Sequence, residues 1–126
     1  MQIEVPASDV ADRISILRIK ITKLVSPTPS VERLDSLENA WRETYVLPLE
    51  NVPEFVELSR INQELWDVED ALRACESCGD FGPTFIHLAR SVYRLNDERS
   101  RVKHRLDKRL QSRFVEQKVF LHPKEP

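Results

Sequence analysis

Apolar residues recur at steps of three and four along four stretches of the chain, residues 8–24, 31–45, 53–78 and 83–113. This spacing is typical of helices that bury one face. The apolar positions of the third stretch are Leu58, Ile61, Leu65, Val68, Leu72 and Cys75, and those of the fourth are Phe85, Leu88, Val92, Leu95, Val102 and Leu106. The pattern therefore predicts four helices, of which the last two are the longest.

The ends of these helices are indicated by residues that favour helix termini. Ser8 and Ser30 are candidate N-caps, and Pro53 and Pro83 suit the first turn of the two long helices. Gly79 is placed to end the third helix. Because only a short loop separates the two long helices, we expect them to form an antiparallel hairpin.

The two ends of the chain alternate in polarity rather than following the helical period. Residues 1–5 and 115–120 are predicted to pair as a small two-stranded ribbon, since neither strand would be stable alone. The expected fold is mainly α: a helical hairpin packed on two shorter helices, forming a single domain over residues 1–126. No secretory signal and no apolar run of about 20 residues is visible, which leads us to expect a cytoplasmic protein.

Charge is divided unevenly along the 126 residues, although the formal net charge is only −2. Residues 32–76 carry twelve acids and four arginines, whereas residues 82–113 carry nine bases and three acids. Packing of an acidic helix on a basic helix explains this division, and an anion site on the basic helix is the alternative. We do not expect nucleic acid as a partner, because an acidic protein gains little attraction for phosphate.

Signals for catalysis or metal binding are weak. Cys75 and Cys78 form a C-x-x-C pair, but they lie where a helix ends, and zinc needs further ligands at suitable spacing. The acidic run from Glu64 to Asp70 could hold magnesium in an enzyme of phosphorylated small molecules. A solvated acidic face explains this run more simply. We therefore expect no metal and no cofactor, and we favour a non-enzymatic protein.

Arg99 interrupts the apolar stripe of the fourth helix, between Val92 and Leu106 at steps of seven residues. Residues seven apart point in nearly the same direction, so Arg99 is expected to be partly buried, with Asn96 and Lys103 on its flank. A buried charge needs a partner. Two interpretations stay open: a structural polar layer, for which the candidate partners are Asn62, Glu64, Glu69 and Asp12, or a pocket for a small anion.

In the pocket interpretation, Arg99, Lys103 and Arg94 bind the anion, and the first helix adds further donors. The donors expected from the first helix are Arg13, Ser15 and Lys20.

Four segments, "EVPAS…DRISILRIK", "INQELWDVEDALR", "DFGPTFIHLARSVYRLNDERSRVKHRL" and "FVEQKVF", resemble a family of short bacterial and viral proteins of unknown function. The family usually has Lys and Thr where this chain has Arg13 and Ser15. The resemblance supplies no activity, and the neighbourhood of sugar-transfer genes in some members implies a glycan or sugar-phosphate context. The positions that match the family's motifs are Asp12, Arg13, Ser15, Leu65, Trp66, Tyr93, Asn96, Asp97 and Arg99.

The function expected from the sequence is non-enzymatic binding of a small anionic ligand, a nucleotide signal or a sugar phosphate, which the protein sequesters. The alternatives are an enzyme acting on phosphorylated small molecules and a protein–protein interaction or adaptor module. The long helices and the two-sided first helix also predict a homodimer or higher homo-oligomer, because they leave apolar surface to cover. The predicted ligand-binding residues are Arg99, Asn96, Lys103, Arg94, Tyr93, Arg13, Ser15, Asp12 and Trp66.

Overall fold

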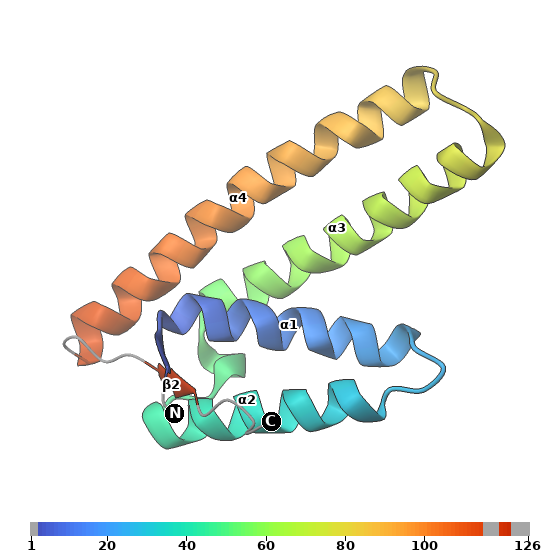
Figure 1. Ribbon diagram of the computed structural model, residues 1–126. Helices are drawn as coiled ribbons and strands as arrows, with labels where there is room; N and C mark the ends of the chain where they lie inside the picture. The colour runs from blue at the N-terminus through green and yellow to red at the C-terminus, as the bar shows by residue number, and fades with distance from the viewer. Residues whose placement is uncertain (1–2, 115–118, 122–126) are drawn as a thin grey trace.

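The computed structural model describes residues 3–114 and 119–121, and within this part of the chain the fold is mainly helical, as predicted. Four α-helices follow one another along the chain (Figure 1). Their bounds are Ala7–Lys23 (α1), Thr28–Thr44 (α2), Pro53–Cys78 (α3) and Pro83–Phe114 (α4), and a short 3-10 helix, Leu49–Asn51 (η1), joins α2 to α3.

The helix ends agree with the sequence signals in α3 and α4 and differ in α1 and α2. Pro53 and Pro83 are the first residues of the long helices, and Gly79 follows α3 with a positive φ of 66°, a conformation that glycine adopts at low cost. The predicted N-caps are wrong: α1 and α2 begin earlier, with Pro6 and Pro27 at the cap positions. Ser8 and Ser30 therefore lie inside the first turn.

The core forms where α1 packs on the half of the α3–α4 hairpin that contains the start of α3 and the end of α4, which we call the lower half, and α2 packs on the other side of α1 (Figure 1). Leu58 and Ile61 of α3, and Val102 and Leu106 of α4, are fully buried there. Trp41 of α2 packs against Tyr45 and donates a hydrogen bond from Nε1 to the carbonyl of Leu47, at 3.2 Å. This bond satisfies the buried indole N–H and holds the segment between α2 and η1.

The upper half of the hairpin projects beyond α1 and α2 (Figure 1). The apolar stripes of α3 and α4 continue into this half, but their side chains are only half-buried, because no third helix lies over them. The half-buried residues of these stripes are Val68, Leu72, Cys75, Phe85, Leu88, Val92 and Leu95. We call residues 66–78 of α3 together with residues 83–95 of α4 the arm.

The two ends of the chain meet in a short contact. Ile3–Val5 (β1) lies antiparallel to Val119–Leu121 (β2), with Glu4 opposite Phe120. A ribbon of the predicted extent, residues 1–5 with 115–120, is not supported. Each described strand has three residues, and residues 1–2 and 115–118 are outside the described part of the chain.

Candidate functional site

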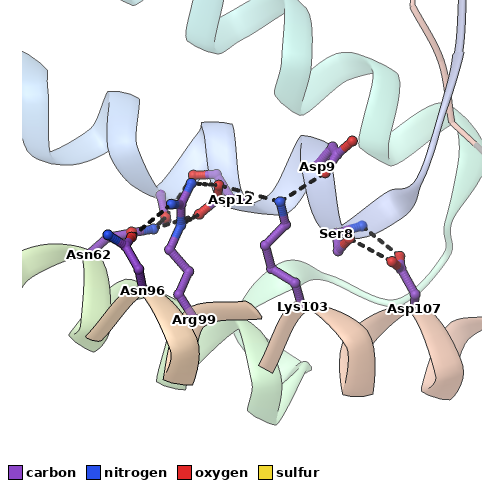
Figure 2. A network of polar contacts seen from close by, with 9 residues as sticks. Ser8, Asp9, Asp12, Asn62, Asn96, Arg99, Lys103 and Asp107 are labelled. Atoms are coloured by element: carbon purple, nitrogen blue, oxygen red, sulfur yellow. Dashed lines mark hydrogen bonds and ion pairs between the residues drawn. The ribbon is translucent and has the colours of Figure 1, made fainter. Parts of the chain in front are cut away.

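Arg99 takes part in a polar cluster that joins α1 to both helices of the hairpin (Figure 2). Its guanidinium donates to both carboxylate oxygens of Asp12, from Nε at 3.0 Å and from Nη2. Nη1 also donates to Oδ1 of Asn96, at 3.4 Å. The fork of the guanidinium thus faces a carboxylate in the two-bond geometry that gives the strongest arginine pairs.

Asp12 and Ser15 of α1 are buried, and Asn62 of α3 completes their hydrogen bonding. The Asn62 amide donates to Oδ1 of Asp12 at 2.8 Å and to the hydroxyl of Ser15 at 2.6 Å. The Ser15 hydroxyl donates in turn to the backbone carbonyl of Asp12, at 2.8 Å. Every buried side-chain nitrogen or oxygen within the described residues has a hydrogen-bond partner, so this cluster contains no unsatisfied buried group.

Two further contacts extend the cluster toward the start of α1 (Figure 2). Lys103 Nζ lies 2.9 Å from Oδ1 of Asp9 and 3.8 Å from Oδ2 of Asp12. Asp107 accepts hydrogen bonds from the backbone N–H of Ser8 at 2.9 Å and from its hydroxyl at 2.6 Å. A carboxylate of α4 therefore binds a free N–H in the first turn of α1, where negative charge is favoured.

The spacing of the α4 residues explains how one helix makes all these contacts. Arg99, Lys103 and Asp107 are four residues apart and consequently lie on one side of α4. Hydrogen bonding to Asp12 raises the pKa of Arg99 above its usual range. The geometry supports the polar-layer interpretation, since a small anion at this place would have to displace Asp12 from the guanidinium.

The structure brings together five of the nine predicted ligand-binding residues and separates the other four. Those that meet in the cluster are Asp12, Ser15, Asn96, Arg99 and Lys103. Arg13 and Tyr93 are exposed, and Trp66 is half-buried on α3. Arg94 lies in a groove of the arm.

Sequence reasoning missed Ser8, Asp9 and Asp107 as members of the cluster. The four-residue spacing on α4 is the signal that leads to Asp107, because it continues the series from Arg99 through Lys103. No comparable signal leads to Ser8, because its side chain does not cap its own helix and its partner is 99 residues away in the sequence.

The arm carries a shallow groove of about 390 Å³. Glu64 and Asp67 line it from α3, and Ser91 and Arg94 line it from α4; Val68 and Leu95 supply its apolar part. Asp67 is five residues beyond Asn62, and Arg94 is five residues before Arg99, which turns each by about 140° around its helix. The groove therefore opens on the side of the hairpin turned away from α1.

A second groove, of about 480 Å³, lies between α1, α2 and η1. It contains two arginines, Arg18 and Arg42, and both approach the carboxylate of Glu38, at 3.5 and 3.7 Å. Arg18 also donates to Glu50 at 3.1 Å. Trp41 and Tyr45 border the same groove, but their side chains are buried in the core.

The acidic and sulfur-containing residues of α3 do not gather into a metal site in the described part of the chain, where no group of three potential ligands is found. Cys75 and Cys78 are free thiols. Among the described helices, none is long and apolar enough to span a membrane.

Comparison with known proteins identifies the family without assigning an activity. The family of unknown function DUF6165 matches residues 1–125, so the chain belongs to this family. No curated protein and no solved structure matches the chain.

Proposed function

We propose that this member of the family is a non-enzymatic interaction module whose binding surface is the arm of the α3–α4 hairpin. The observation that carries the proposal is the contrast between the two halves of one hairpin. Leu58 and Val102 are fully buried in the lower half, whereas the same stripes are half-buried in the arm. The partner that fits this surface is an amphipathic helical segment, which would lie in the groove of the arm against Val68 and Leu95.

Three further apolar side chains are exposed near the end of the hairpin, outside the groove. Phe81, Ile86 and Tyr93 are 53%, 55% and 52% exposed, and all three lie in the loop or on α4 within the arm. Phe81 and Phe85 stack edge to face at the end of the hairpin, with ring centroids 5.3 Å apart. Soluble monomers rarely expose clustered apolar residues of this size unless a partner covers them.

Site-specific photo-crosslinking tests this proposal. A photoreactive amino acid replaces Ser91, which lines the groove of the arm, in the full chain produced in cells. The matched control carries the same amino acid at Val25, which is fully exposed and lies between α1 and α2, outside both grooves. We expect a defined adduct from position 91, with the crosslink in a helical segment of the partner, and none from position 25.

Two outcomes overturn the proposal. One is the absence of any adduct from position 91, and the other is equal, non-selective labelling from both positions. Identification of the crosslinked peptide by mass spectrometry shows whether the partner is another protein or a second copy of the chain.

Binding of a small anionic ligand is a second candidate function, and the groove between α1, α2 and η1 favours it over the Arg99 cluster. Arg18 and Arg42 stand together there, and paired guanidinium groups suit a phosphate or carboxylate. The ligand's anionic group would replace Glu38 as their shared partner. The classes of ligand that we propose are nucleotides and sugar phosphates.

Thermal unfolding in the presence of nucleotides and sugar phosphates tests the second candidate. A ligand that binds the folded state raises the unfolding midpoint in proportion to its saturation. We expect the shift to disappear in Arg18→Met/Arg42→Met and to persist in the control Arg101→Met, which changes an exposed arginine of α4. A panel without any shift in the wild-type protein would remove this candidate.

A further inference from the structure

We infer that the arm binds a second copy of this chain, so that two hairpins form a four-helix bundle in which α3 of each copy packs beside α4 of the other. The inference rests on the proposed function and names the partner of the same surface. Its basis is the self-complementary charge of the two sides of the arm groove.

The two helices of the arm carry opposite charge. Residues 66–78 contain four acids and one arginine, whereas residues 83–95 contain two arginines and no acid. Within the groove, Glu64 and Asp67 lie on the α3 side and Arg94 lies on the α4 side. Glu64 is ion-paired with Arg60 of its own helix at 2.8 Å, so Asp67 is the carboxylate best placed to meet Arg94 of the other copy. When a two-fold axis brings two such grooves face to face, each acidic side can meet the basic side of the other copy.

Charge also selects the pairing of helices. If α3 lay beside α3 of the second copy, the acids of two identical segments would be adjacent, and like charges at an interface are costly. Placing α3 beside α4 of the second copy leaves the two acidic helices diagonal to each other. Val68 and Leu95, the apolar residues of the groove, then face their counterparts in the second copy at the centre of the bundle.

The rest of the described chain leaves the groove side of the arm accessible. Helix α1 is held by Asn62, Arg99 and Lys103, on the side of the hairpin turned away from the groove. Toward the base, the groove side is occupied by the Arg60–Glu98 and Arg105–Glu57 ion pairs, whose nitrogen–oxygen distances are 2.6 and 2.7 Å. The groove of the arm therefore stays open, with Val68 and Leu95 as its apolar lining.

The size of the arm sets the expected affinity of the dimer. Thirteen residues per helix give a length of about 20 Å, and two adjacent helices give a width of about 20 Å. The resulting face of about 400 Å² is roughly half of what each partner contributes to a standard interface. We therefore expect a dimer that forms and dissociates in the micromolar range.

Light scattering with complementary charge reversals tests the inference on the full chain. The variant Glu64→Lys/Asp67→Lys makes both sides of the groove basic, and Ser91→Glu/Arg94→Glu makes both sides acidic. The matched control, Asp35→Lys/Glu43→Lys, makes the same charge change as the first variant at exposed positions of α2. Circular dichroism checks that each variant remains folded.

At concentrations up to about 500 µM, which cover weak association, we expect wild type and control to approach twice the chain mass of 14.7 kDa. Each groove variant alone should stay near 14.7 kDa, and their equimolar mixture should recover the dimer. Recovery on mixing shows that loss of association in the separate variants does not come from misfolding.

Three results contradict the inference. A wild-type chain that stays monomeric throughout excludes the second copy as partner, and groove variants that still dimerise exclude this face. Variants that fail to recover on mixing exclude the pairing of α3 with α4 of the second copy. If the wild type is monomeric while position 91 crosslinks a different protein, the proposed function holds and this inference alone fails.

Discussion

Replacing Arg99 with methionine tests whether the cluster that holds α1 is structural. The substitution keeps much of the apolar stem but removes two hydrogen bonds to Asp12, whose side chain is 7% exposed compared with 29% for Arg99. The Asp12 carboxylate would then keep the Asn62 amide at 2.8 Å and the Lys103 ammonium at 3.8 Å. A nearly buried carboxylate would lose its main partner.

The expected loss of stability follows from these contacts. Breaking a buried ion pair by removing one member typically costs about 3–5 kcal/mol, and partial exposure of Arg99 together with the nearby Lys103 lowers this to about 2–4 kcal/mol. For a chain of this length, that loss corresponds to a fall of about 10 °C in the unfolding midpoint. Urea and thermal unfolding followed by circular dichroism measure both quantities.

A double-mutant cycle separates the ion pair from other effects of the substitution. Asp12→Asn removes the charge that Arg99→Met leaves behind, so we expect the double variant to be more stable than the sum of the single losses predicts, by about 1–3 kcal/mol. Arg101→Met serves as the control and should change stability by less than about 0.5 kcal/mol, because Arg101 is exposed. If Arg99→Met were as stable as the wild type or more stable, the polar-layer account would be wrong, and repulsion among unoccupied cations of an anion pocket would explain the result.

The remaining predictions concern the two tyrosines, the start of α1 and the hairpin loop. Burial, with a smaller contribution from Asp107, raises the pKa of Tyr45 to about 12, whereas hydrogen bonds with Arg90 and Arg94 lower the pKa of the exposed Tyr93. Ultraviolet absorbance should therefore show Tyr93 ionising below pH 10 and Tyr45 near pH 12; a single shared step would contradict this assignment. Because the pKa of Tyr45 is higher in the folded state, its contribution to stability is complete below pH 10 and is lost as the pH rises toward 12, by up to roughly 3 kcal/mol. This part of the pH dependence should be absent from Tyr45→Phe in urea unfolding. Asp107→Ala should lower the free energy of unfolding by about 1–2 kcal/mol because it removes both acceptors of Ser8, and an unchanged urea midpoint would show that this contact stabilises nothing. Gly79→Ala should cost about 1 kcal/mol from its positive φ alone, since a Cβ at this position meets no atom within 4 Å; a loss above about 3 kcal/mol in urea unfolding would show that this explanation is incomplete.

The helices were predictable from the sequence because their signals are local. The three- and four-residue spacing of apolar side chains, together with Pro53, Gly79 and Pro83, defines the hairpin without knowledge of the rest of the fold. The starts of α1 and α2 were not predicted correctly, since Ser8 and Ser30 resemble N-caps in sequence. In α1, the hydroxyl of Ser8 instead binds Asp107 of a distant helix.

The candidate site was predictable only in part. A charge inside an apolar stripe indicates a buried polar group, and this argument leads to Arg99 and to Asp12 as one of its possible partners. The choice among Asn62, Glu64, Glu69 and Asp12 depends on how α1 crosses the hairpin, which no local pattern encodes. The open arm could not be predicted either. In the sequence, the half-buried stripe that contains Leu72 and Leu88 looks the same as the buried stripe that contains Leu58 and Leu106, and only the structure shows where α1 ends along the hairpin.

Hydrogen–deuterium exchange along the hairpin tests most directly the central claim that the arm is an uncovered surface awaiting a partner. In dilute solution, we expect amides of residues 66–78 and 83–95 to exchange faster than those of residues 54–65 and 99–110, because fewer buried contacts stabilise the helices of the arm. Addition of the partner, or concentration of the chain if the partner is a second copy, should slow exchange in the arm and leave the lower half unchanged. Equal protection of both halves in dilute solution, with no change in the arm as its partner is added, would contradict the account.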